Sequence, residues 1–470
     1  MKKVARLLFV FAAGCALAGG NGGSNGGSNG GGAGAAAATP LAARCQALFT
    51  RALDDNEAMA TLRRLVAVAP KRLSGSAGFA RAVDWGQATM RDIGLENIRL
   101  EPCMVPCWVR GEERAEVTSG GAPLPLRVTA LGGSVGTGEG GVEAEVVEVR
   151  TFEQLQAMGG AAKGKIVFFN RPMPRALKRT GQAYGEAVPQ RSDGAVQAAK
   201  VGGVAALVRS MTTAIDGYPH TGAMHYADGV PQVPAAAIAT ADAEELSKRL
   251  QAGPVRVRLV LGCETRPDVP GANVVGDLRG GEHPEEIVLI GGHLDAWDLG
   301  TGAHDDGAGC AHVLEAARLL VACGVRPRRT IRVVLFANEE NGLRGAKAYA
   351  EAHAGEIDKH KAAIETDGGG FTPMGFASSL DGAEAKAVEA LFAPLRDWNA
   401  GLFLPAAGGC GADIGVLYER GVPCFGLWVD GARYFDYHHT AVDDLPAVNE
   451  RELALGAAAV AFAASTIADR

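Results

Sequence analysis

Short apolar runs alternate with longer amphipathic stretches along the chain from residue 273 onward. A short continuous apolar run is typical of a buried parallel strand, whereas apolar residues spaced three or four apart are typical of a helix. The predicted strands are 273–278, 287–290, 330–336, 362–365 and 424–429, and the predicted helices are 307–323, 343–353, 383–396 and 449–467. This alternation predicts an α/β fold with a doubly wound, mostly parallel sheet.

The part of the chain before residue 273 shows two further sequence patterns. Residues 41–127 begin with two helical patterns and a strand, which suits the flank of the same α/β domain. Residues 128–263 contain short strand-like runs separated by glycine-rich turns, which predict a small β-rich domain inserted into the first and shaping a cleft. Residues 264–470 then complete the catalytic domain. The alternative is that 128–263 belongs to one continuous α/β domain.

The N-terminus has the pattern of an export signal. Lys2, Lys3 and Arg6 precede the apolar run 7–13, which is too short to span a bilayer. We therefore expect export to the periplasm or the extracellular space.

Two processing sites compete in this segment. Ala16-Leu17-Ala18 fits a signal peptidase site and would end a signal peptide at residue 18, whereas the segment ending at Cys15 resembles a bacterial lipobox. The second would give an outer-membrane lipoprotein with a lipid anchor on Cys15. The Gly/Ser/Asn/Ala-rich segment 19–40 is a linker that cannot build a core.

The amino-acid composition limits the classes of molecule that the protein is expected to bind. The chain has 470 residues, and its 46 Lys+Arg against 53 Asp+Glu give a net charge of −7. This mild acidity, with no basic block, argues against a nucleic-acid partner. Export makes disulfides accessible to the nine cysteines, and Cys103 and Cys107 are a plausible local pair.

Acids and histidines follow the predicted strands. They are His293, Asp295, Asp305 and Asp306 after the second strand, Glu339 and Glu340 after the third, Asp367 after the fourth, and His438 and His439 after the fifth. Taken alone, each of these residues has a purely structural explanation. An acid can cap a helix or lie in a solvated turn, and a histidine can be an ordinary loop residue. Because the carboxyl ends of parallel strands meet at one edge of a sheet, we expect these residues to converge.

Such a set suits a metal centre. Asp, Glu and neutral His are ligands for Zn²⁺, and a single ion takes about four of them. The chain offers more than four, which favours two ions bridged by one carboxylate. Within the adjacent pair Glu339-Glu340, one carboxylate would bind metal while the other takes a proton from water.

Four segments carry a resemblance to a known family. They are GGHLDAWDLGTGAHDDGAG (291–309), ANEENGLRGAKAYA (337–350), ETDGGG (365–370) and YHHTAVDD (437–444). In these segments the chain resembles the M28 family of di-zinc aminopeptidases and carboxypeptidases, and is most similar to its plasma glutamate carboxypeptidase branch. Residues 128–263 resemble a protease-associated domain. Asp444 stands where the family usually has Thr. This departure puts a detail of helix capping in doubt, but it affects none of the expected metal ligands.

The resemblance implies a role for each residue. His293 and Asp367 would hold one zinc, Glu340 and His439 the other, and Asp305 would bridge them. The family pattern His-Thr-x-x-Asp favours His439 over His438. Glu339 would be the general base and acid, Asp295 would orient His293, and Asp306 and His438 would support the site from behind the ligands. The resemblance also implies a cis peptide bond between Asp305 and Asp306, and dimerisation.

The expected activity is zinc-dependent hydrolysis of dipeptides or short peptides at a free end. Whether the amino or the carboxyl end is used stays open. The alternatives are a one-zinc cyclase of the same fold, a di-zinc hydrolase acting on a non-peptide amide, and a binding protein without catalysis, although the last would lack ligands and none is missing here.

Overall fold

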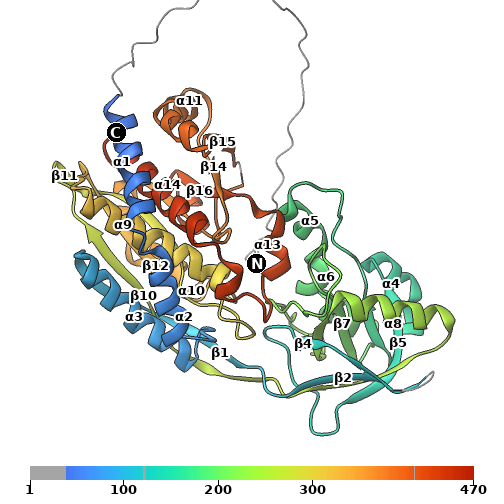
Figure 1. Cartoon of the computed structure of the whole chain (residues 1–470). Helices are drawn as coiled ribbons and strands as arrows, with labels where there is room; N and C mark the ends of the chain where they lie inside the picture. Colours follow the sequence, from blue (N-terminus) through green and yellow to red (C-terminus); the bar gives the residue numbers. More distant parts are fainter. Residues whose placement is uncertain (1–38, 120–122, 407) are drawn as a thin grey trace, which may run out of the picture.

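Two eight-stranded sheets organise the chain (Figure 1). The computed structural model describes residues 39–119, 123–406 and 408–470. The predictions of a signal peptide, of a lipobox at Cys15 and of nearly all of the linker 19–40 lie outside the described residues.

The first sheet has a parallel centre and antiparallel flanks. Its order is β1-β10-β12-β11-β13-β16-β14-β15. The strands are β1 (Glu96–Val109), β10 (Glu264–Leu278), β12 (Arg329–Phe336), β11 (His283–His293), β13 (His360–Glu365), β16 (Cys424–Val429), β14 (Pro373–Ser378) and β15 (Leu402–Pro405). The neighbours β12, β11, β13 and β16 are parallel, and so is the edge pair β14–β15, whereas the pairs β1–β10, β10–β12 and β14–β16 are antiparallel. The sheet is therefore mixed, with its parallel part at the centre.

Helices cover both faces of the first sheet. The helices of this part of the chain are α1 (Pro40–Asp54), α2 (Ala58–Val68), α3 (Ala77–Ile93), α9 (Gly309–Ala322), α10 (Arg344–Ala352), α11 (Gly382–Leu391), α12 (Gly415–Tyr418), α13 (Tyr434–Tyr437) and α14 (Glu450–Ala468), of which α13 packs against the second sheet's core instead. Apolar residues of α1, α3, α9 and α14 form one core with one face of the sheet, and those of α10 and α12 form a second core with the other face. This covering on two sides is the doubly wound arrangement.

The C-terminal helix α14 is a core helix. The side chain of Asn449 accepts hydrogen bonds from the N–H groups of Arg451 and Glu452 and caps its start. By length and composition α14 could cross a membrane, but 89% of its apolar window is buried inside the protein. Its apolar surface is therefore satisfied by packing against α9 and the sheet.

The second sheet lies beside the first. Its order is β3-β2-β9-β5-β6-β7-β8-β4, with β3 (Leu124–Leu126), β2 (Glu113–Val117), β9 (Arg256–Leu261), β5 (Val142–Val149), β6 (Ile166–Phe169), β7 (Ala205–Arg209), β8 (Ala235–Ile238) and β4 (Val128–Ala130). Its helices are α4 (Phe152–Met158), α5 (Thr180–Ala187), α6 (Pro189–Ser192), α7 (Gly194–Lys200) and α8 (Thr240–Ala252). The sheet begins at residue 113, before the expected start of the β-rich region at 128. We refer to residues 113–261 as the second unit.

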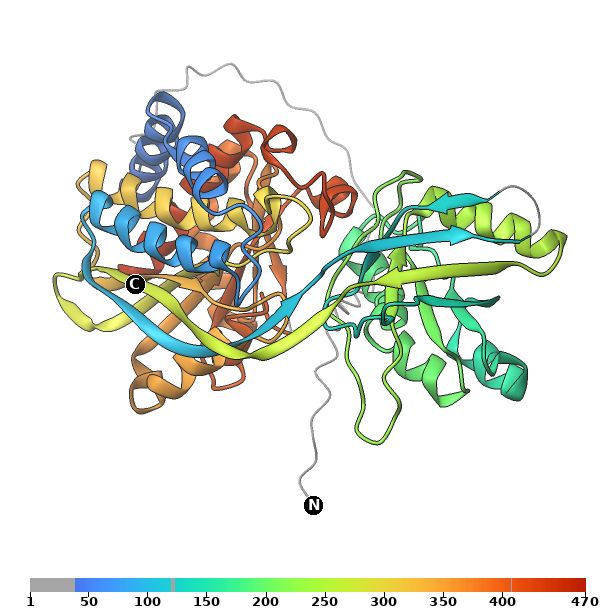
Figure 2. The ribbon, with the colours of Figure 1, turned by 90° about the horizontal axis from the view of Figure 1, so that it is seen from below.

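Two long strands join the sheets. β1 runs on into β2, and β9 runs on into β10, so that the antiparallel pair β1–β10 passes from one sheet to the other (Figure 2). The second unit is thereby connected to the first at one edge and faces the segment 430–440 (Figure 1).

Cysteine pairing differs from the prediction. Cys410 and Cys424 form a disulfide, whereas Cys103 and Cys107 are free. The predicted pair fails because both cysteines lie on β1, and four residues of extended strand cover about 13 Å, more than a disulfide can bridge.

Candidate metal centre

The predicted site residues meet at the carboxyl edge of the parallel strands. His293 ends β11, Glu339 and Glu340 follow β12, and Asp367 follows β13. The histidine pair follows α13, in the loop after β16. Alignment of the parallel strands brings these segments together, as the sequence predicts.

Asp305 lies at the centre of the cluster. One of its carboxylate oxygens is 3.1 Å from Nε2 of His293, and the other is 3.1 Å from Nε2 of His439. Asp305 precedes α9, and a cis peptide bond joins it to Asp306. A carboxylate placed between two imidazoles in this way can bridge two ions.

The two imidazoles each face a further carboxylate. Nε2 of His293 lies 3.6 Å from an oxygen of Asp367, and Nε2 of His439 lies 3.0 Å from an oxygen of Glu340. Ligand atoms of His293, Asp305 and Glu340 lie within 4.8 Å of one another, as do those of His293, Asp306 and Asp367. The two ligand sets therefore share His293.

His438 and His439 occupy different positions at this site. Their rings stack with centroids 3.5 Å apart, but Nε2 of His438 is 3.7 Å from Asp305, farther than that of His439. His439 alone of the two makes a contact with Glu340. Geometry thus favours His439 as the ligand.

Buried carboxylates hold the ligands from behind. Asp306 accepts hydrogen bonds from the N–H groups of His293, at 3.0 Å, and Gly309, at 2.9 Å. Asp443 accepts from the N–H groups of His304, at 2.6 Å, and Asp305, at 3.1 Å. These bonds fix the backbone on which the ligands sit.

Asp295 contacts both His293 and the segment that carries Glu339. Nδ1 of His293 contacts the backbone carbonyl of Asp295 at 3.0 Å, and the Asp295 carboxylate is 3.8 Å away. That carboxylate instead accepts from the N–H of Glu339, at 3.0 Å, and from the hydroxyl of Ser74, at 2.9 Å. Its side chain therefore fixes the backbone of the predicted general base.

The pKa shifts of the buried side chains at the site favour the binding of a cation. Burial, with the charge of Asp305 beside it, raises the pKa of Glu340 to about 7. Burial raises the pKa of Glu339 well above its ordinary value, although His293 opposes the shift. Burial disfavours a charged His439, but Glu340 and Asp305 outweigh this and raise its pKa to about 9. Carboxylates that resist ionisation in this way would be relieved by a cation.

The donor set fits a metal. The Asp305 oxygen beside His439 and the Asp367 oxygen beside His293 are buried, and neither makes a hydrogen bond of normal geometry. A void of about 10 Å³ lies among residues that include Asp305, Glu340 and His439, and a single water needs roughly 10–15 Å³. Oxygen and imidazole ligands around so small a space suit a zinc ion.

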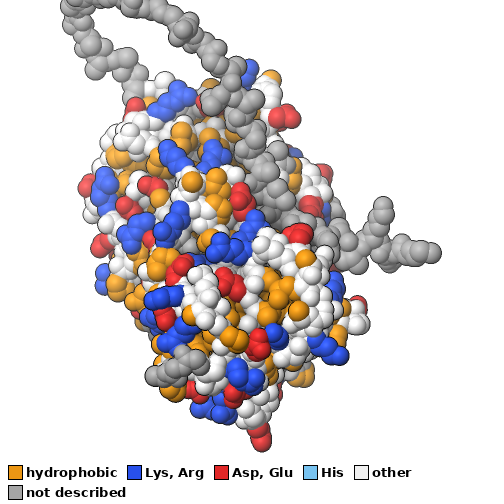
Figure 3. Space-filling view, turned by 90° about the vertical axis from the view of Figure 1, so that its right-hand side faces the viewer, with side chains coloured by type: hydrophobic (Ala, Val, Ile, Leu, Met, Phe, Trp, Pro, Cys, Tyr) orange, Lys and Arg blue, Asp and Glu red, His pale blue; other side chains and the backbone are white. Residues whose placement is uncertain are grey.

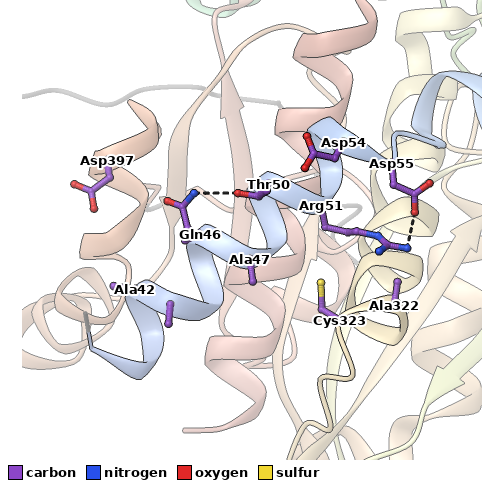
Figure 4. A pocket seen from close by; sticks show the side chains of 11 residues that line it. Ala42, Gln46, Ala47, Thr50, Arg51, Asp54, Asp55, Ala322, Cys323 and Asp397 are labelled. Atoms are coloured by element: carbon purple, nitrogen blue, oxygen red, sulfur yellow. Dashed lines mark hydrogen bonds and ion pairs between the residues drawn. The ribbon is translucent and has the colours of Figure 1, made fainter. Parts of the chain in front are cut away.

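A groove elsewhere on the molecule lacks these ligands. It has a volume of about 980 Å³ and runs along α1 and the C-terminal end of α9 (Figure 4). The metal cluster lies at the opposite, N-terminal end of α9. In the groove Gln46 bonds to Thr50 and Arg51 pairs with Asp55.

Sequence reasoning missed the contribution of the second unit. The N–H of Thr221 donates to the carbonyl of His439 at 3.0 Å, and the Thr221 carbonyl lies 3.3 Å from Nδ1 of that imidazole. Tyr184 packs edge-on against His438 with centroids 5.3 Å apart. The sequence of the segment that contains Thr221 carries no signal for this contact.

A second pair of acids lies next to Asp367. Glu365 accepts from the N–H groups of Ala412 and Ile414, at 2.9 and 2.7 Å, while both oxygens of the buried Asp413 lack partners. Burial raises the pKa of Asp413 well above its ordinary value, and the charge of Glu365 adds to this. The sequence GADIG around Asp413 carries no signal for such a role.

The outer surface carries both charges. On the face seen in Figure 3, Lys and Arg side chains are interspersed with Asp and Glu.

Comparison with known proteins finds peptidases that are similar to this chain in sequence and in structure. The model of peptidase family M28 matches residues 273–464. Carboxypeptidase Q of Bos taurus is 36% identical over 415 residues, covering 88% of this chain and 86% of the relative. A crystal structure of a peptidase M28 precursor from Shewanella amazonensis is 37% identical, with a TM-score of 0.87 over 92% of this chain and 97% of that one. A zinc aminopeptidase from Bacillus subtilis shares the fold, with 20% identity and a TM-score of 0.62 over 87% and 93%.

Proposed function

The chain belongs to peptidase family M28 and is a metallo-exopeptidase, and from this premise we propose that it binds two zinc ions and hydrolyses dipeptides or short peptides at the carboxyl end. The observation that carries this proposal is the position of Asp305 between His293 and His439, with Asp367 and Glu340 completing one set on each side. The name of the curated relatives, carboxypeptidase Q, supports the carboxyl end.

The ligand roles follow from these contacts. His293 and Asp367 would hold one ion, Glu340 and His439 the other, and Asp305 would bridge them. When bound, zinc lowers the pKa of water and polarises a carbonyl. Asp306 and Asp443 would keep the ligand-bearing backbone in place through the hydrogen bonds described above.

Glu339 would handle the proton. Its carboxylate lies 4.0 Å from Nε2 of His293. It would take a proton from the attacking water and return it to the leaving amine, as general base and then general acid. The hydrogen bond from its N–H to Asp295 holds the segment in position.

We also propose that residues 128–263 are an insert similar to a protease-associated domain that walls one side of the substrate cleft. The contact of Thr221 with His439 supports this arrangement, because it brings a second-unit loop against a ligand. We also propose that the protein is exported from the cytoplasm. The disulfide between Cys410 and Cys424 supports this location. Anchoring through a lipid on Cys15 remains part of that proposal.

Metal analysis with peptide turnover tests the proposed function. We expect about two zinc ions per chain and chelator-sensitive cleavage of dipeptides. Glu339→Gln should retain the zinc and lose about 10²–10⁴-fold in kcat, the usual contribution of a general base. Wild-type turnover by the zinc-loaded variant would refute the role of Glu339, and one zinc with no peptide cleavage would favour the cyclase.

An aminopeptidase is the second candidate. Family M28 fixes the catalytic class, and the metal cluster itself selects neither end of a peptide. Cleavage that is abolished by blocking the amino end and unaffected by blocking the carboxyl end would establish it.

A further inference from the structure

We infer that Trp297 is a positioning residue through which the second unit sets the metal affinity of one ligand set, Glu340 with His439; the inference rests on the proposed di-zinc function. Trp297 follows the ligand His293 by four residues and is only 3% exposed. Its indole is packed into the second unit, whereas its backbone contacts a metal ligand. One residue therefore joins the two parts of the molecule.

The indole of Trp297 is part of the second unit's apolar core. The other buried residues of this core lie within 113–261, apart from Leu73 and Trp108. Trp108 packs edge-on against Trp297, with ring centroids 6.4 Å apart. The indole Nε1 is buried and has no hydrogen-bond partner. Packing alone therefore sets the position of this ring, and a change in the packing can move it.

The backbone of the same residue orients Glu340. The N–H of Trp297 donates to Oε1 of Glu340 at 3.2 Å, while Oε2 of that carboxylate lies 3.0 Å from Nε2 of His439. This division of the two oxygens fixes the rotation of the carboxylate, so that Oε2 is the oxygen presented to an ion. The indole also lies beside the ring of His439, with centroids 5.8 Å apart. A shift of Trp297 would therefore disturb both members of one ligand set.

Gly132 of the second unit leaves the space that the indole occupies. A Cβ at this position would overlap the six-membered ring of Trp297, at Cη2 and Cζ3. The backbone of Gly132 is held in place, because its N–H donates to the carbonyl of Gly222 at 2.9 Å and its carbonyl accepts from the N–H of Met224 at 3.0 Å. A side chain at position 132 would therefore displace the indole, without altering any residue of the metal cluster.

The second unit contacts only one of the two ligand sets. Besides the contact through Trp297, the N–H of Thr221 donates to the carbonyl of His439 at 3.0 Å. In the part of the chain that the structure describes, no hydrogen bond from residues 113–261 reaches His293 or Asp367. The second unit should therefore affect the ion held by His439 and leave the other ion unchanged.

The test measures zinc affinity by competition with a chromophoric chelator, which needs no turnover. In Gly132→Ala we expect one of the two ions to bind about 10–100-fold more weakly, the usual effect of disturbing a residue that supports a metal ligand, while the other ion keeps its affinity. Gly160→Ala is the matched control in the same unit, because a Cβ at this exposed position would meet nothing within 4 Å. It should bind both ions as the wild type does.

Two further variants identify which ion is weakened. His293→Ala retains the set formed by Glu340 and His439, and adding Gly132→Ala should weaken the zinc that remains by the same factor of about 10–100. His439→Ala retains the set formed by His293 and Asp367, and adding Gly132→Ala should leave the affinity for its zinc unchanged.

Rescue tests the role of the indole itself. Trp297→Phe keeps the backbone N–H and lacks the outer ring that a side chain at position 132 would meet. Added to Gly132→Ala, it should restore most of the lost zinc affinity, a gain that two independent losses of stability would not give. If Gly132→Ala does not fold, Trp297→Ala leaves the backbone of the second unit unchanged and should show the same selective loss of one ion.

The outcomes separate this inference from the proposed function. Retention of both ions in Gly132→Ala, equal weakening of both, or absence of rescue would overturn the role of Trp297, while cleavage of dipeptides by the wild type would leave the exopeptidase standing. Selective loss of one ion from a protein that cleaves no peptide would support the positioning role and refute the proposed activity. A wild type that binds no zinc at Glu340 and His439 would refute both.

Discussion

The carboxylate of Asp295 accepts a hydrogen bond from the backbone N–H of Glu339 at 3.0 Å. This bond joins the segment after β11 to the segment after β12, and the second oxygen of Asp295 is held by Ser74. Asp295 is fully buried. It thus ties the predicted general base to the loop that begins with His293.

We predict that Asp295→Ala lowers kcat by about 10–100-fold, the usual effect of losing a residue that supports a metal site. Without the acceptor, the N–H of Glu339 is left unpaired and its carboxylate loses a fixed position. Zinc content should stay near that of the wild type. Steady-state kinetics with metal analysis checks this, with Asp92→Ala as an exposed control; loss of zinc together with activity would assign Asp295 to metal retention instead.

The stacked histidines offer a matched pair of variants. We expect His439→Ala to lose about one of two zinc ions, since His439 faces both Asp305 and Glu340 at 3.0–3.1 Å. His438→Ala should keep both ions, because its closest carboxylate contact is 3.7 Å away. Elemental analysis after dialysis separates the two cases, and equal loss in both variants would contradict the assignment.

The convergence of the cluster was predictable because it depends on the parallel strands β11, β12 and β13. Each of these is a short apolar run whose polar successor must lie at one edge, so His293, Glu340 and Asp367 could be placed without coordinates. The cis bond before Asp306 followed from family resemblance alone.

Other features depend on tertiary packing that the local pattern does not encode. β14 and β15 were missed, since these short segments lie at the edge of the sheet and are interrupted by Pro in both strands and by Gly in β14. The predicted helix 383–396 is divided into α11 and a 3₁₀ turn that starts at Ala393 and includes Pro394. The approach of Thr221 to His439 could not be read from residues that are 218 positions apart.

The disulfide gives a third prediction. Cys410 and Cys424 enclose a segment whose N–H groups at Ala412 and Ile414 hold Glu365, two residues before Asp367. With a sequence separation of 14, its loss should reduce the free energy of unfolding by about 3 kcal/mol. Denaturant unfolding of Cys410→Ser/Cys424→Ser should show this decrease. Cys103→Ser, which alters a free cysteine, serves as control, and an equal effect of that variant would remove the case for the disulfide.

A buried histidine far from the metal ligands predicts how stability depends on pH. His312 lies in α9 against α14, where a Cβ at Gly456 would meet its Nε2, and neither ring nitrogen has a hydrogen-bond partner. Burial lowers the pKa of His312 from 6.5 to about 3. Between these values the unfolded chain takes up a proton that the folded protein does not, so the free energy of unfolding falls as the pH falls through this window, by about 1.4 kcal/mol per pH unit.

His312→Leu removes this pH-dependent contribution. The free energy of unfolding of the variant, relative to that of the wild type, should therefore be about 2 kcal/mol higher at pH 5 than at pH 7. Denaturant unfolding of both proteins at the two pH values measures the difference, with the exposed His225→Gln as control. A constant difference between the two pH values would mean that His312 is protonated in the folded protein and finds a partner there.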